Sequence, residues 1–352
     1  MAFSRVFSLD DPSACRAAFP SADVELFPTA KGSFHAEITQ VGMNGIWMHR
    51  IHVSLPEINT VAVKPGRRSI GFLTKCNSAS LLDCGREIRR GDIVINRSDV
   101  VHQRTGANFH YGTVSLPCDD LAATAEAIIG RELPETPHKS VVRPSTALMC
   151  RLLNLHKSIG QLAHDAPDIL RCPEVTRALA TGLIHTLVKC LAEGHPLEQS
   201  VGGRRHGTAF NRFVEFLRAN PDRPIFLAEI CAAIGVAERT LRASCEEQLG
   251  MGPIRYLTLR RMHLARRALQ HADPLESTVT RVATDHGFWE LGRFSVAYRA
   301  LFGESPSETL RREARRPELP ANGPSAYPAH LMAANLELDR AIERRRSFSR
   351  AR

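Results

Sequence analysis

Three arginines fall on the outward faces of two short predicted helices, where their side chains could bind a partner. Arg239 and Arg242 lie on the first helix and Arg293 on the second. A guanidinium carries a planar fork of N–H donors that fits a guanine edge or the oxygens of a phosphate. A solvated helix face is the other role that such arginines fill. The net charge of +9, with no lysine after Lys189, favours a polyanionic partner.

The first of these helices belongs to a predicted helix-turn-helix. That motif needs a tight turn that tolerates positive φ and a small residue where its helices cross. Gly235 supplies the turn and Cys231 the small residue. The apolar positions that would hold the pair together are Leu227, Ile230, Ile234, Val236, Leu241 and Cys245. The outer face of the second helix is the one that enters a major groove in such motifs.

The pattern recurs about fifty residues later, around Gly287 and Phe288, with Phe294 and Tyr298 on the inner side of the following helix. The helical period of residues 253–270 predicts a rigid spacer between the two motifs. Ser305-Pro306-Ser307-Glu308 has the residues of a capping box and predicts the start of a last helix. Two motifs in tandem are a much stronger signal than one.

Here the sequence resembles a known family. Ala283-x-x-x-Gly287-Phe288, Arg293-Phe294-Ser295 and Tyr298-Arg299-x-Leu301-Phe302-Gly303-Glu304-Ser305-Pro306-Ser307 are similar to the signature of AraC/XylS-type transcription regulators. The resemblance covers roughly residues 206 to 316. It implies that each recognition helix occupies one of two adjacent major-groove segments of double-stranded promoter DNA.

Carried over by position, the DNA-binding residues would be Arg239, Thr240, Arg242, Ala243, Glu290, Gly292, Arg293 and Val296. Ala243, Gly292 and Val296 have no hydrogen-bonding side chain, so direct base recognition would rest on the three arginines. Ala237 stands where the family often has a serine cap, which leaves the first recognition helix less well capped.

Short strands separated by glycines predict a β-rich domain between residues 27 and 116. Residues 91–102 are similar to the second motif of cupin barrels, which commonly form the effector domains of this family. In metal-binding cupins the histidine at His102 is a ligand, but residues 70–85 contain no histidine to join it. No metal or other cofactor is therefore expected. His102, Trp47 and His49 are candidates for a small-effector pocket.

Two apolar stripes predict long helices after this domain. The first stripe is Leu148, Leu152, Leu155, Ile159 and Leu162, and the second is Val175, Leu179, Leu183, Leu187 and Leu191. Packing onto the sheet and formation of a subunit interface are both open for them. No signal peptide or membrane span is expected, so a cytoplasmic protein is predicted.

The expected fold is multidomain α+β: an N-terminal β-rich cupin-like barrel with following helices, then an all-α double helix-turn-helix. The predicted ranges are an effector domain (1–118), a helical dimerisation region (119–193), a linker (194–207), a DNA-binding domain (208–316) and a basic tail (317–352) with a helix over 331–343.

The sequence predicts a one-component transcription regulator that is not an enzyme, since no nucleophile–base arrangement is evident. Its partners would be promoter DNA, a small effector and a second copy in a homodimer, with RNA polymerase an open further partner. The alternative is a cupin-type metalloenzyme that carries a DNA-binding unit.

Overall fold

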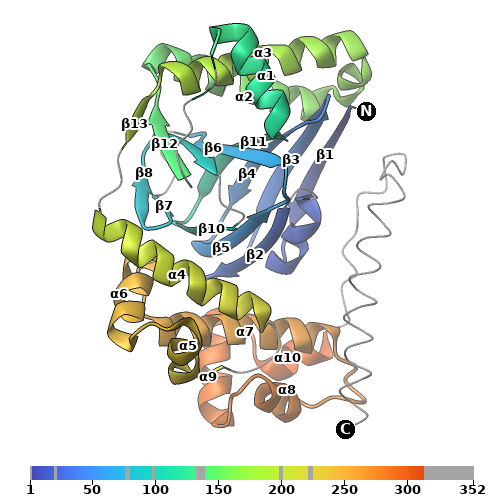
Figure 1. The fold of residues 1–352 in the computed structure, drawn as a ribbon. Helices are drawn as coiled ribbons and strands as arrows, with labels where there is room; N and C mark the ends of the chain where they lie inside the picture. The colour runs from blue at the N-terminus through green and yellow to red at the C-terminus, as the bar shows by residue number, and fades with distance from the viewer. Residues whose placement is uncertain are drawn as a thin grey trace. The chain divides into compact units, whose positions relative to one another are not determined.

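The computed structural model describes residues 2–19, 22–75, 80–96, 100–131, 133, 139–197, 201–220 and 225–312. Its N-terminal part contains two antiparallel sheets (Figure 1). The eight-stranded sheet has the order β1 (Phe3–Leu9), β3 (Ala36–Met43), β4 (Ile46–Val53), β11 (Phe109–Pro117), β6 (Arg67–Leu73), β9 (Ile93–Asn96), β12 (Lys139–Arg143), β13 (His195–Leu197). The five-stranded sheet has the order β2 (Ala22–Pro28), β5 (Glu57–Val63), β10 (Val100–Thr105), β7 (Leu81–Asp83), β8 (Arg86–Ile88).

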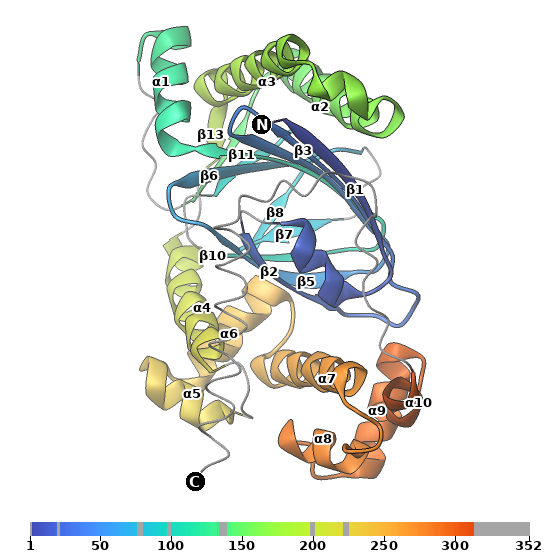
Figure 2. The ribbon, with the colours of Figure 1, turned by 90° about the vertical axis from the view of Figure 1, so that its right-hand side faces the viewer.

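Three helices cover the outer face of the eight-stranded sheet: α1 (Cys118–Ile129), α2 (Thr146–Asp165) and α3 (Pro173–Glu193) (Figure 2). Strand residues that alternate toward this face, such as Met48 and Phe72, form one buried cluster with Leu152 and Leu183 of the helices. Because side chains alternate along a strand, every second residue points the other way, toward the five-stranded sheet. Every residue of the two predicted apolar stripes except Val175 belongs to this cluster or packs against it.

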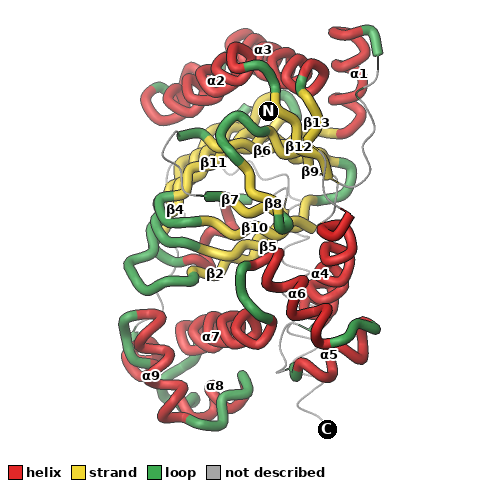
Figure 3. The backbone as a smooth tube through the Cα atoms, turned by 90° about the vertical axis from the view of Figure 1, so that its left-hand side faces the viewer, coloured by secondary structure: helices red, strands yellow, loops and turns green. Residues whose placement is uncertain are grey.

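The β-rich expectation is confirmed, with one difference in architecture. Among the described residues the strands pair into two separate sheets, and no pairing closes them into a barrel. The sheets are layered between helices on either side (Figure 3).

The segments at the β12–β13 edge of the eight-stranded sheet also differ from the sequence expectation. The range expected as a linker, 194–207, carries β13, which pairs with β12, and the start of α4 (Val201–Ala219). The range expected to be helical, 119–193, contains β12 between α1 and α2. The glycine-rich composition did not reveal these elements because the pairing of β13 depends on a partner about fifty residues away. The expected tail helix lies outside the described residues.

Helix α3 is long and apolar enough, by length and composition, to cross a membrane, which the sequence expectation did not foresee. One side of it is buried in the protein: Leu183, Leu187 and Val188 have no exposed surface and belong to the cluster between these helices and the sheet. This burial fits a core helix of the domain.

The C-terminal part is helical and has two buried clusters joined by one helix. The helices are α4, α5 (Leu227–Ile234), α6 (Glu238–Leu249), α7 (Pro253–His271), α8 (Val279–Asp285), α9 (Leu291–Phe302) and α10 (Pro306–Arg311). Tyr256 and Leu257 of α7 pack with α4, α5 and α6, whereas Met262 and Leu269 pack with α8, α9 and α10. Helix α7 therefore packs into both helix-turn-helix units and connects them, as the spacer prediction requires.

Candidate nucleic-acid interface and internal cavity

Helices α5 and α6 form the first helix-turn-helix. Gly235 ends α5 in the left-handed conformation, with φ of 65°, which glycine adopts without strain. Leu241 and Cys245 bury the inner face of α6 completely. No side chain caps α6, because its N-cap is Ala237.

The outer face of α6 carries the predicted recognition residues. Arg239, Thr240 and Arg242 are exposed, and Ala243 is half-buried. The Arg242 guanidinium forms an ion pair with Glu238 one turn earlier, at 3.0 Å. Both groups are more than half exposed, so this pair contributes little to stability and can break when a ligand approaches.

Helices α8 and α9 repeat the motif. The Thr278 hydroxyl accepts a hydrogen bond from the Arg281 N–H and caps α8, and Gly287 makes the turn with φ of 76°. Phe294 and Tyr298 are buried on the inner face of α9, as the sequence predicts.

The outer face of α9 carries Arg293 beside apolar surface in its first turns, and a second exposed arginine, Arg299, lies in the last turn. The Arg293 side chain is 84% exposed and its Nε lies 2.9 Å from a Glu290 carboxylate oxygen. Gly292 is exposed with open space around it, and Trp289 and Val296 are 72% and 73% exposed. Large apolar groups left this exposed are typical of a contact surface.

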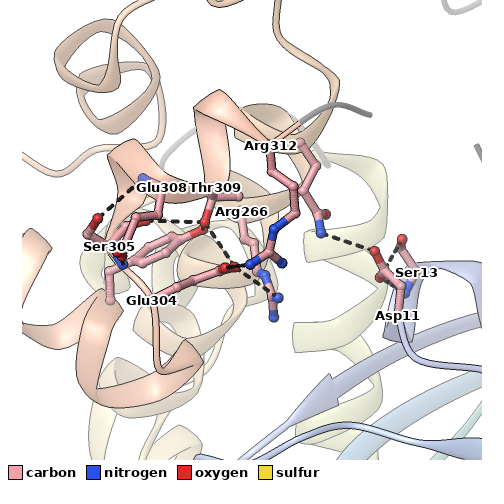
Figure 4. Close-up of polar contacts among 10 residues, drawn as sticks. Asp11, Ser13, Arg266, Glu304, Ser305, Glu308, Thr309 and Arg312 are labelled. Atoms are coloured by element: carbon pink, nitrogen blue, oxygen red, sulfur yellow. Dashed lines mark hydrogen bonds and ion pairs between the residues drawn. The ribbon is translucent and has the colours of Figure 1, made fainter. Parts of the chain in front are cut away.

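A buried polar network fixes α10 and α9 on α7 (Figure 4). The Glu304 carboxylate lies 3.2 Å from Arg266 and 2.7 Å from Arg312, and Thr309 Oγ1 donates to it at 3.0 Å. Tyr298 donates its hydroxyl hydrogen to Thr309 at 2.9 Å. The predicted capping box is present: Ser305 Oγ accepts from the Glu308 N–H, and Glu308 accepts from the Ser305 N–H.

The N-terminal part contains an internal cavity between its two sheets. Residues of β2, β5 and β10 line it from one side, and residues of β4, β6, β9 and β11 from the other. Most lining side chains are apolar, including Leu26, Ile51 and Phe109. None of the described residues that line it is a lysine or an arginine.

Of the three predicted pocket residues, the structure places one at the cavity. His49 lines it, and burial lowers the pKa of this histidine to about 4, so the imidazole is neutral. His102 lies on the opposite face of β10, where its ring meets Phe210 of α4 edge-on at 4.9 Å. Trp47 is outside the lining and is covered by the Arg67 guanidinium, 5.0 Å from its ring centroid.

The cavity has polar residues that the sequence analysis missed. Glu57 and Asn59 of β5 and Gln103 of β10 line it and are at least nine-tenths buried. Burial raises the pKa of Glu57 to about 8, and the hydrogen bond from Asn59 opposes that rise. The alternation Glu57, Asn59, Val61 within a strand was the signal available, since it places these residues on one face.

The outward residues of the same strands contact the helical part. Arg260 of α7 lies 3.7 Å from Glu25 of β2, and His263 Nε2 donates to the Pro28 carbonyl at 2.9 Å. Ile58 of β5 is buried in the cluster of α4, α5 and α6. The five-stranded sheet thus has the cavity on one face and the helices on the other.

The geometry of α5 to α10 defines a tandem helix-turn-helix protein, and the comparisons agree. Residues 230–312 match a family model described as a helix-turn-helix domain. The chain is 40% identical over 98 residues to a probable thc operon regulatory protein of Rhodococcus erythropolis, which covers 28% of this chain and 30% of that protein. It is 33% identical over 140 residues to the XylDLEGF operon transcriptional activator 2 of Pseudomonas putida, which covers 38% of this chain and 82% of that protein.

The chain belongs to the AraC/XylS-type family of transcription regulators. Its aligned part spans less than half the length of several of these relatives, for example 46% of the Pseudomonas putida XylDLEGF operon transcriptional activator 1. Among solved structures, the AraC-like transcriptional activator CuxR is similar at 16% identity and a TM-score of 0.39, over 75% of this chain and 95% of that one.

Proposed function

We propose that this chain is a one-component transcription regulator that binds promoter DNA through α6 and α9 and senses a small molecule in the cavity between its sheets. The observation that carries the DNA-binding part is the pair of exposed recognition faces held by one helix, α7. Its two ends are buried in separate clusters, so the two faces keep a fixed spacing. Two recognition helices that enter successive major-groove segments of one duplex require such a fixed spacing.

The predicted site residues fall into two roles in this proposal. Arg239, Arg242 and Arg293 would donate to base edges or phosphates. Thr240, Ala243, Glu290, Gly292 and Val296 would shape the contact surface around them. On α9, Arg293 would contact one base position, and the apolar groups beside it favour recognition of the neighbouring positions through DNA shape.

The five-stranded sheet offers a physical route from the cavity to the DNA-binding helices. A ligand that moves the inward residues of β2 or β5 also moves the outward residues that contact α4 and α7. Such coupling would shift the balance between conformations that the free protein already has. Promoter DNA, the effector, a homodimer formed in the 119–193 region and a contact with RNA polymerase belong to this proposal, together with the domain ranges given above.

Selection of bound fragments from genomic DNA tests the proposal. The full chain should enrich a small set of sequences, and the doubly substituted Arg239→Ala, Arg293→Ala chain should lose that enrichment. Equal capture of all fragments by both chains would contradict sequence-specific regulation. Elemental analysis of the same preparation tests the metalloenzyme alternative, which stoichiometric iron or manganese would favour. The described residues hold no group of three or more His, Cys, Asp or Glu side chains suited to a metal ion.

A further inference from the structure

One end of the cavity presents two buried oxygens that have no hydrogen-bond partner among the described residues. Asn59 Nδ2 donates to Glu57 Oε1 at 3.1 Å, and both residues are buried, with 7% and 2% of their surface exposed. The other carboxyl oxygen, Glu57 Oε2, and the amide oxygen, Asn59 Oδ1, have no hydrogen-bond partner among the described residues. Buried polar atoms are paired in most proteins, so two neighbouring orphans that line a cavity point to a ligand.

The rest of the lining supplies few donors to these atoms. Asn96 on the opposite sheet adds a third buried oxygen, Oδ1, without a donor. The Tyr111 hydroxyl and His49 Nε2 also line the cavity without a hydrogen-bond partner among the described residues, and neither reaches Glu57 Oε2 or Asn59 Oδ1. Gln103 itself donates to Asp83 at 3.0 Å. At the Glu57 end the Asn59 amide oxygen therefore lacks a donor, and the Glu57 carboxyl can donate when protonated or accept when ionised.

The charge of the lining excludes one ligand class. With no lysine or arginine among the described lining residues, a carboxylate or phosphate would be buried without a cationic partner. It would also face the oxygens of Glu57 and Asn59. An anion buried in a largely apolar site without a cation loses its hydration uncompensated, which weakens binding by about tenfold or more.

We infer that the cavity binds a small, largely apolar molecule whose polar head donates hydrogen bonds and carries no negative charge, with Glu57 and Asn59 receiving that head. This inference rests on the proposed sensing function of the same cavity. The apolar body of the ligand would lie against Leu26, Ile51 and Phe109.

Two kinds of head group satisfy this chemistry, and they differ in whether the Glu57 carboxyl keeps its proton. A hydroxyl head accepts from the protonated Glu57 carboxyl and donates to Asn59 Oδ1, so no proton leaves. An ammonium head forms an ion pair with the Glu57 carboxylate, and the carboxyl proton is released to solvent. The raised pKa of Glu57, about 8, means that the proton is present to be released at neutral pH.

Three probes with one ring and different heads test the inference on the full chain: benzyl alcohol, benzylamine and benzoate. Calorimetric titration at pH 7 should give binding of the first two, with benzoate weaker by about tenfold or more. Titration in two buffers of different ionisation enthalpy should show proton release with benzylamine and none with benzyl alcohol.

Variants at Glu57 connect the binding to this end of the cavity. Glu57→Gln keeps an uncharged polar group, so it should hold benzyl alcohol within about threefold but lose about tenfold for benzylamine. Glu57→Leu should weaken both. Glu87→Gln changes an exposed acid on β8, outside the lining, and should change neither affinity.

Benzoate binding as tight as that of the other two probes would overturn the inference, and so would equal affinities in the wild type and both Glu57 variants. Absence of measurable binding by both donor probes would overturn it too. If Glu57→Leu fails to fold, the three probes on the wild type and on Glu57→Gln still decide. These titrations contain no DNA, so their failure is distinct from failure of the fragment selection, which tests the proposed function.

Discussion

Arg293 stands out at the residue scale because its surroundings isolate it. Glu290 pairs with it at 2.9 Å, Gly292 and Val296 beside it have no hydrogen-bonding side chain, and the other exposed arginine of α9, Arg299, lies in the last turn. On α6, Arg239 and Arg242 share the outer face. Loss of one arginine should therefore have sharper consequences on α9.

We predict that Arg293→Ala weakens binding to the selected fragment by about 1–3 kcal/mol and relaxes the preference at one base position. Binding to random DNA should change much less, because a base contact is made only on the correct sequence. Fluorescence anisotropy on both DNAs measures the difference. Arg90→Ala, which removes an exposed arginine that follows β8, is the matched control for lost charge. Equal losses on both DNAs would show that Arg293 contacts a phosphate.

Glu57 gives a residue-scale prediction about stability. Burial raises its pKa from 4.5 to about 8, so the unfolded chain loses this proton at a lower pH than the folded protein does. The stability that the protonated group contributes is complete below about pH 4.5 and is lost as pH rises through about 8. Glu57→Gln does not titrate. Its free energy of unfolding relative to the wild type should increase from pH 5 to pH 8 and then level off.

Urea unfolding at pH 5, 6.5, 8 and 9 measures this difference. In Glu87→Gln the corresponding difference should stay flat, because Glu87 is exposed. A flat profile for Glu57→Gln would mean that the carboxyl is ionised in the folded protein and that its pKa is not raised.

The two classes of site residue differ in how far the sequence could predict them. Arg239 and Arg293 follow from helix period and a nearby turn glycine, which are local features. His102 fits a family motif, but one residue of strand register decides which face of β10 it occupies, and Val101 and Gln103 line the cavity in its place. Glu57 and Asn96 line one cavity only because two sheets pack together, which no local spacing encodes.

At the scale of elements, the caps of α6 and α10 are opposite cases. Ser305 and Glu308 cap α10 reciprocally, whereas Ala237 leaves α6 without a side-chain cap. We predict that Ala237→Ser stabilises the chain by about 0.5–1 kcal/mol and that Ser305→Ala destabilises it by about 1 kcal/mol. Chemical unfolding measures both. Destabilisation by Ala237→Ser would contradict the extended backbone that the structure assigns to this N-cap.

The Glu304 network makes a second prediction for the elements. Its side chain is 12% exposed and interacts with Arg266, Thr309 and Arg312. Glu304→Ala would leave the half-buried Arg266 without its acid, so we expect a loss of about 2 kcal/mol in stability. Hydrogen exchange should become faster in α9 and α10 while α5 and α6 keep their protection. Uniform acceleration over all four helices would show that the network supports the whole domain.

The first turn of α4 shows why glycine content gave a wrong prediction at this scale. Gly202 and Gly203 have low helix propensity, yet α4 begins at Val201. Its later residues Phe210 and Phe213 are buried against α5, α6 and Ile58, and burial of large apolar side chains outweighs a weak local preference. The helix-turn-helix pairs were predictable because their turns and cores are close in sequence.

At the scale of the whole molecule, charge and recognition can be separated by salt. The chain carries a net charge of +9, and after Lys189 it has arginines but no lysine. Phosphates neutralised by these arginines release counterions, so we predict that the logarithm of the binding constant falls steeply and linearly with the logarithm of salt concentration. Titrations of the selected fragment between low and physiological salt measure the slope.

The slope also tells which arginines contact bases. A variant that loses a phosphate contact lowers the slope by about one unit, whereas loss of a base contact lowers affinity at every salt concentration and leaves the slope unchanged. We expect Arg293→Ala and Arg239→Ala to keep the wild-type slope while binding more weakly. A wild-type slope near zero would contradict the DNA-binding proposal. A reduced slope in both variants would instead assign α6 and α9 to the phosphate backbone, and sequence preference would then have to come from DNA shape at the surface of Trp289 and Val296.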